Sequence, residues 1–149
     1  MVHVLAPRPA DPICPIFLNV DSNVGRNLSA EPEDVLLVQF MLRKVGEVGS
    51  TAFSADQLAL LRQVPLSGKV DNTTHDAIIT WQTVGGDQVD GVISVARGYM
   101  WGPKRWTIAQ MNATINNRFH DIYPNIDRIP GCPAPLAKAV RSALAGSGK

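Results

Sequence analysis

The residues best suited to bind a ligand lie between positions 97 and 106, where aromatic and basic side chains occur together. The candidates in this segment are Tyr99, Trp101, Arg105 and Trp106. Tryptophan and tyrosine rings stack on the apolar faces of sugars, and arginine pairs with carboxylates, so this combination is typical of a site for an acidic glycan. A structural role is the alternative, because two large tryptophan side chains can also fix the C-terminal segment to the core.

Residues that could perform catalysis are few and scattered. His3, His75 and His120 lie far apart, and the sequence has no HExxH metal motif, no GxSxG nucleophile motif and no glycine-rich phosphate loop. We therefore expect no metal ion, no cofactor and no enzymatic activity. Cys14 and Cys132 form no CxxC pair, so they are either two buried or free thiols or one long-range disulfide.

Length and composition indicate a folded protein of about one domain. Of the 149 residues, 45% are hydrophobic and 18% are charged, and the formal net charge is +1. So small a charge provides no field to attract nucleic acid or an anionic membrane. The longest apolar stretch, residues 35–42, is too short for a membrane helix, and the N-terminus lacks the pattern of a secretory signal. We expect synthesis in the cytoplasm, with action in the periplasm or in a phage or injection particle left open.

The order of turn and helix signals predicts an all-α protein in three parts. These are an extended arm with a short strand over residues 1–30, a compact helical core over 31–94 and a C-terminal helical appendage over 95–149. The strand-like run covers residues 16–20, and helices are predicted over residues 32–45, 55–61, 73–82, 107–119 and 136–144. The first helix has two apolar faces, so we expect the arm or a partner chain to cover its second face.

The middle of the chain repeats a pattern in which a helix with an apolar–glutamine pair is associated with a polar turn. The pairs are Val38-Gln39 and Trp81-Gln82, and the turns fall at residues 68–71 and 89–91. We expect the glutamine side chains to hydrogen-bond loop backbone, and the aspartate and glycine residues to form the turns.

Taken in order, these residues resemble the peptidoglycan-binding-domain-like family. The matching residues lie within about 24–94 and include Val38-Gln39, Leu42, Val45-Gly46, Val70-Asp71, Thr74, Ala77-Ile78, Trp81-Gln82 and Val89-Asp90-Gly91. The resemblance implies a three-helix module that binds the bacterial cell wall without catalysis. The lead-in residues 23–25, followed by residues 33–35, are also similar to family members found beside bacterial and phage cell-puncturing or injection machinery.

Two functions from different classes are consistent with these features. The first is a non-catalytic module that binds peptidoglycan, with the aromatic and basic residues of 99–106 as its candidate site. The alternative is a structural or adaptor subunit of a phage tail, contractile injection or secretion assembly, in which the same fold contacts other proteins. The proline-rich arm favours the alternative, because such a segment can lie along a neighbouring protein. Neither function involves nucleic acid or membrane insertion.

Overall fold

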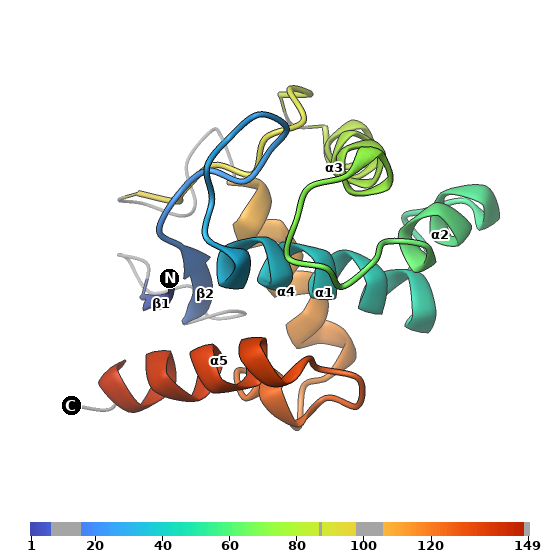
Figure 1. Ribbon diagram of the computed structural model, residues 1–149. Helices are drawn as coiled ribbons and strands as arrows, with labels where there is room; N and C mark the ends of the chain where they lie inside the picture. Colours follow the sequence, from blue (N-terminus) through green and yellow to red (C-terminus); the bar gives the residue numbers. More distant parts are fainter. Residues whose placement is uncertain (7–15, 87, 98–105, 148–149) are drawn as a thin grey trace.

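Helices dominate the protein, and a small sheet lies at one side of the molecule beside α1, α4 and α5 (Figure 1). The computed structural model describes residues 1–6, 16–86, 88–97 and 106–147. In chain order the elements are β1 (Val2–Leu5), β2 (Phe17–Val20), α1 (Pro32–Val48), α2 (Ala55–Arg62), α3 (Asn72–Gly85), α4 (Thr107–Arg118), a 3-10 helix (Ile126–Arg128) and α5 (Ala134–Ser147). The expectation of a broadly helical protein is confirmed. The all-α assignment is wrong in one respect, because β1 and β2 form a two-stranded antiparallel sheet. None of the described helices has the length and apolar character needed to cross a membrane.

α1 is the central helix and is buried on both of its apolar faces. Pro32 occupies its first turn, where the N–H that proline lacks has no helical partner, and two acidic residues follow at the positive end of the helix dipole. α2, α3, α4, α5 and β1 all contact α1 (Figure 1). Leu37, Phe40 and Met41, which form the second face, are buried by the chain itself. The predicted burial on two sides is therefore confirmed, but the expected cover by the arm or a partner chain is wrong in part, because α4 and α5 contact α1 more extensively than β1 of the arm does.

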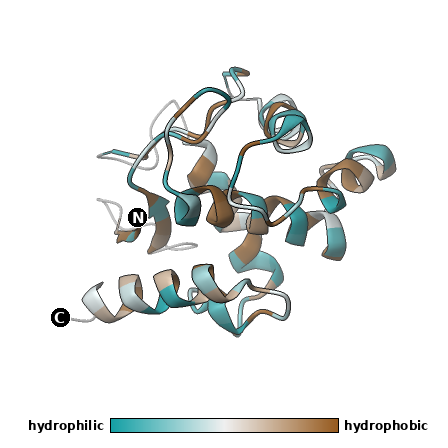
Figure 2. Ribbon diagram, in the orientation of Figure 1, coloured by the Kyte–Doolittle hydropathy of each residue, from teal (hydrophilic) through white to brown (hydrophobic). Residues whose placement is uncertain are grey.

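One hydrophobic core draws on all three parts that the sequence distinguishes. Phe17 and Leu18 of β2, Ile108 and Met111 of α4 and Leu136 of α5 are fully buried in the same cluster as α1. Figure 2 shows apolar residues on β2, α1 and α4. Burying a side chain of this size contributes roughly 1.5–3 kcal/mol. Both terminal segments are therefore integral to the stability of the fold.

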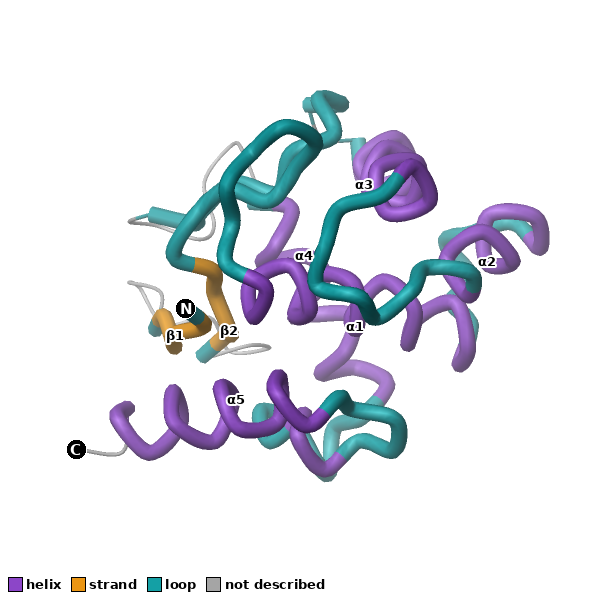
Figure 3. Tube along the Cα trace, in the orientation of Figure 1, coloured by secondary structure: helices purple, strands orange, loops and turns teal. Residues whose placement is uncertain are grey.

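Gln39 on α1 holds the loop between α2 and α3, as predicted for a glutamine in this position. It is fully buried. Its Oε1 accepts hydrogen bonds from the main-chain N–H groups of Ser67 and Gly68, at 3.1 and 2.9 Å. Its Nε2 donates to Lys69 O at 2.8 Å and to Thr74 Oγ1 at 3.1 Å. A single side chain thus satisfies the main chain of a loop (teal in Figure 3) that has no secondary structure of its own.

Gln82 on α3 makes the same set of bonds in the loop that follows α3. Its Oε1 accepts from Asp90 N and Gly91 N, at 3.2 and 2.9 Å, and its Nε2 donates to Val92 O at 2.9 Å. The middle residue of each turn is a glycine with positive φ, 77° at Gly68 and 73° at Gly91. Only glycine adopts this conformation readily. The repeat seen in the sequence is therefore also a repeat in three dimensions.

α1 and α2 approach most closely at Gly46. Ser54 and Gln57 form the predicted capping box at the start of α2. The helix then turns Leu61, which is fully buried, toward α1. Arg62 Nη1 donates to Gly46 O at 3.2 Å. The missing side chain at Gly46 lets the two backbones come into contact.

A side chain, and not another strand, closes the outer edge of β2. Asn112 on α4 accepts from Leu18 N at 2.8 Å and donates to Leu18 O at 2.8 Å. A neighbouring strand would bond the same two groups. The hydroxyl oxygen of Tyr123 lies 2.7 Å from Asn112 Oδ1 and 2.9 Å from Ile16 O. This edge therefore has no free polar groups at Leu18 with which to recruit another chain.

Candidate functional site

The site residues predicted from the sequence fall mostly outside the described parts of the chain. Tyr99, Trp101 and Arg105 lie in the segment 98–105, and only Trp106 is described. Trp106 immediately precedes α4 and packs, half-buried, against the hydrophobic core. This packing is what the structural alternative predicts for Trp106. The glycan site itself stays a prediction.

The described histidines lie in separate parts of the fold. His3 is on β1, with Nδ1 2.5 Å from Asp21 Oδ1, whereas His75 is on α3 and His120 follows α4. Within the described ranges, no three His, Cys, Asp or Glu side chains gather closely enough to hold a metal ion.

Cys132 is a half-buried, free thiol in the loop before α5. Burial, and the nearby Asp127 carboxylate, raise the pKa of this thiol to about 11. The thiol is therefore protonated at neutral pH and is a poor nucleophile. Cys14 lies outside the described residues, whereas Cys132 is a free thiol, as the first of the two alternatives expects.

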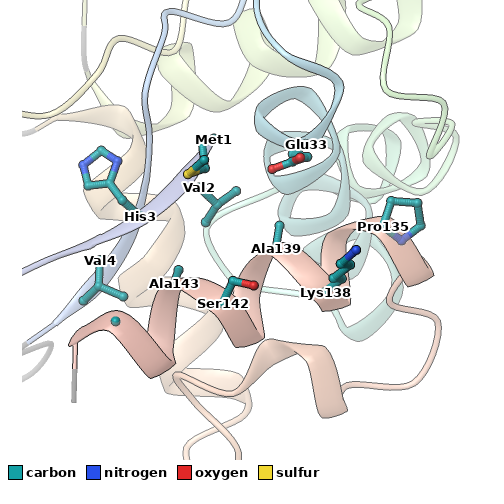
Figure 4. A pocket seen from close by; sticks show the side chains of 11 residues that line it. Met1, Val2, His3, Val4, Glu33, Pro135, Lys138, Ala139, Ser142 and Ala143 are labelled. Carbon is teal, nitrogen blue, oxygen red and sulfur yellow. The ribbon is translucent and has the colours of Figure 1, made fainter. Parts of the chain in front are cut away.

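The structure brings together a groove that the sequence did not predict, between β1 and the exposed face of α5 (Figure 4). Its volume is about 590 Å³, within the range of roughly 300–1,000 Å³ that is usual for ligand sites. We call it the β1–α5 groove. Its lining residues are Met1, Val2, His3, Val4, Glu33, Pro135, Lys138, Ala139, Ser142, Ala143 and Gly146. The lining is mainly apolar, and its titratable side chains are those of His3, Glu33 and Lys138.

The face of α5 that lines this groove is made of small residues. Ala139 and Ala143 lie one turn apart, and Gly146 follows at the C-terminal end of the helix. The adjoining face of α5 carries Leu136 and Val140, which are fully buried in the core, and Ala139 and Ala143 also pack against that core. The helix is thus anchored along this side, and Gly146 is exposed where the groove reaches the end of the helix. The groove escaped prediction because its two walls come from opposite ends of the chain.

The amino group of Met1 lies at one end of the groove among three carboxylates. It is 2.7 Å from Glu31 Oε2, 3.1 Å from Asp34 Oδ1 and 3.4 Å from Asp21 Oδ2. Desolvation lowers the pKa of this amino group, but its hydrogen bonds to Glu31 and Asp34 outweigh that effect and raise the pKa to about 10. Burial raises the pKa of Asp34, against the opposing influence of the ammonium group and Ser22. Ion pairs thus hold the start of β1 against the start of α1.

We expect this cluster to make folding stability fall as the pH rises through about 10. The folded state binds the Met1 proton more tightly than the unfolded chain does, so its stabilising contribution is complete below about pH 8 and is lost as the pH passes about 10. Because the ion pairs are partly exposed, the expected effect is only about 1 kcal/mol. The contribution of the Met1 ammonium to the free energy of unfolding is measured by urea unfolding of the unmodified chain and of a chain acetylated at its amino group. The unmodified chain should be the more stable at neutral pH and lose this advantage above pH 10; an advantage that persists there would exclude the charge as its cause.

Comparison with known proteins found no match: no family model, no curated protein and no solved structure is similar to this chain.

Proposed function

We propose that this chain is a non-catalytic binding module for bacterial cell-wall peptidoglycan. The observation that supports the proposal is the pair of glutamine-held turns. Gln39 and Gln82 occupy equivalent places in the pattern that resembles the peptidoglycan-binding-domain-like family. Each makes hydrogen bonds to two main-chain N–H groups and one carbonyl group of its own turn. Residues that carry the resemblance thus hold two turns of the main chain by the same pattern of hydrogen bonds.

The proposed ligand contacts come from the segment that precedes α4. Tyr99, Trp101 and Arg105 supply the ring faces and the cation that a glycan with carboxylate-bearing stems requires. Trp106 connects this segment to the core, because it is both the last residue before α4 and a packed core neighbour. Wall binding would place the protein outside the cytoplasm, in the periplasm or in a particle that meets the wall.

Co-sedimentation with purified insoluble peptidoglycan tests the proposal. We expect the wild-type chain to pellet with the wall in moderate salt. Trp101→Ala and Arg105→Ala should each reduce the pelleted fraction severalfold, because each removes a direct contact to the glycan or its stem.

The matched control is Leu28→Ala, which removes an exposed apolar side chain, 46% accessible, far from this segment in the sequence. It should pellet as the wild type does, and circular dichroism should show that every variant remains folded. A folded wild-type chain that stays in the supernatant would refute wall binding.

The β1–α5 groove favours a second function, that of a structural or adaptor subunit in a phage tail, contractile injection or secretion assembly. The groove lies between the N-terminal strand and the C-terminal helix, and apart from Glu33 its lining residues are outside the part of the chain that resembles the wall-binding family. Analytical ultracentrifugation with candidate assembly proteins would distinguish the two functions, because a subunit should form complexes and ignore the wall.

A further inference from the structure

The segment that ends at residue 97 is bound to the loop between β2 and α1. Val24 N donates to Ile93 O at 2.9 Å, and Ile93 N donates to Val24 O at 2.8 Å, so the two segments are antiparallel at this point. Both residues are fully buried. Residues 94–97 therefore run back along this loop toward β2 (Figure 1).

Two asparagine side chains continue the pairing beyond this bridge. Asn23 Oδ1 accepts from Val95 N at 2.9 Å. Asn19, on β2, accepts from Ala96 N at 3.2 Å and donates to Ala96 O at 3.0 Å. Neither Val95 N nor Ala96 N has another acceptor among the described residues. The main chain at 95–96 is thus held by side chains and not by a strand.

The residues that follow the segment 98–105 are also held on β2. Asn112 of α4 bonds both main-chain groups of Leu18, which is the neighbour of Asn19 in the chain. The described residues on the two sides of 98–105 are therefore bonded to two adjacent residues of β2.

This anchoring bears on ligand binding, because a segment whose main chain is already fixed loses less conformational freedom when it binds. Ala96 lies three positions before Tyr99, the first of the proposed ligand contacts. A side chain that fixes the main chain at 95–96 therefore lowers the entropy cost that those contacts must offset.

We propose that Asn23 and Asn19 are positioning residues for the wall-binding segment, and that they act through the main chain of Val95 and Ala96 without touching the ligand. This inference rests on the wall-binding proposal. Asn23 gives the clearer test, because it is exposed and its substitution removes no buried side chain, whereas Asn19 is fully buried.

The affinity for insoluble peptidoglycan, measured as a pelleting isotherm in moderate salt, tests the role of Asn23. Asn23→Leu removes the acceptor of Val95 N, so the apparent Kd for the wall should rise about threefold to tenfold, as the loss of one hydrogen bond can produce. Asn23→Asp keeps an oxygen acceptor in the same place, so its Kd should stay within about twofold of the wild-type value.

The matched control is Asn117→Leu, which makes the same substitution on α4. Asn117 is exposed, and its side chain forms no hydrogen bond with the described residues. Its Kd should also stay within about twofold of the wild-type value. Circular dichroism should show that every variant is folded at the temperature of the assay.

Amide hydrogen exchange separates positioning from a purely structural role. When the wild-type chain is saturated with wall fragments solubilised by a muramidase, the amides of Val95 and Ala96 should exchange severalfold more slowly, because the ligand and the anchored main chain stabilise each other. The amides of Ser67 and Gly68, which Gln39 holds, should change much less. A purely structural role would leave the two pairs of amides alike.

Three results would overturn this inference while leaving wall binding intact. They are a folded Asn23→Leu chain that binds the wall as tightly as the wild type, an Asn23→Asp chain that binds as weakly as Asn23→Leu, and amides of Val95 and Ala96 that the ligand slows no more than those of Ser67 and Gly68. If Asn23→Leu does not fold, the exchange comparison in the wild type still decides. A wild-type chain that does not pellet would refute both proposals.

Discussion

The Gly46→Ala variant is expected to lose about 3 kcal/mol of unfolding free energy, a large share of the stability of a domain this size. A Cβ at Gly46 would lie 2.5 Å from Arg62 N and 2.8 Å from both the carbonyl carbon and the Cβ of Leu61. Two of these atoms belong to the backbone of α2, which cannot move aside as a flexible side chain could. α1 and α2 must therefore separate, which opens the contact that buries Leu61. Urea denaturation followed by circular dichroism measures the loss.

Gly146→Ala is the matched control, because it makes the same substitution in another helix. A Cβ at Gly146 would meet nothing within 4 Å. Alanine is the better helix former, so this variant should be unchanged or more stable by about 0.5 kcal/mol. A similar loss in both variants would mean that contact between α1 and α2 is not the cause.

The Gln39→Met variant is expected to lose about 3 kcal/mol or more. Methionine matches the length of glutamine but makes no comparable hydrogen bonds, so the N–H groups of Ser67 and Gly68 lose their acceptor, and the carbonyl of Lys69 keeps only the bond from Ser67 Oγ. Each buried polar group left unsatisfied costs roughly 1–3 kcal/mol. Urea denaturation measures the total loss of unfolding free energy. This loss is smaller where water can hydrogen-bond the loop groups that Gln39 no longer satisfies.

Amide hydrogen exchange separates this local effect from a general loss of stability. In Gln39→Met the amides of Ser67 and Gly68 should exchange much faster, while those of Asp90 and Gly91 change only as the global stability does. Gln82→Met should give the reverse pattern, because Gln82 holds the second turn. If both turns open equally in either variant, the two glutamines do not act as independent units.

Features set by local sequence were predictable. The capping box at Ser54 and Gln57 depends only on residues three positions apart, and the positions of the helices follow from the spacing of apolar residues. The glutamine bonds were also predictable, because a glutamine on a buried helical face must find polar partners, and the nearest are loop main chain.

Features set by contacts between distant segments were not predictable. β1 has only four residues, and eleven residues separate its end from the start of its partner β2, so no turn signal joins them. α5 was predicted two residues short at its start and three at its end, because Pro135 and Gly146 suggest helix boundaries; Pro135 instead lies in the first turn, where its missing N–H has no helical partner, and Gly146 lies in the last turn. The β1–α5 groove depends on both of these elements. The aromatic and basic residues at 99–106, in contrast, are conspicuous in the sequence alone.

The amide of Asn112 limits how the sheet can grow. It occupies both main-chain groups of Leu18 as a strand would, yet it is a side chain and presents no new edge to a further molecule. The sheet therefore cannot be extended beyond β2 at Leu18, and copies of this protein cannot join into a filament through that edge.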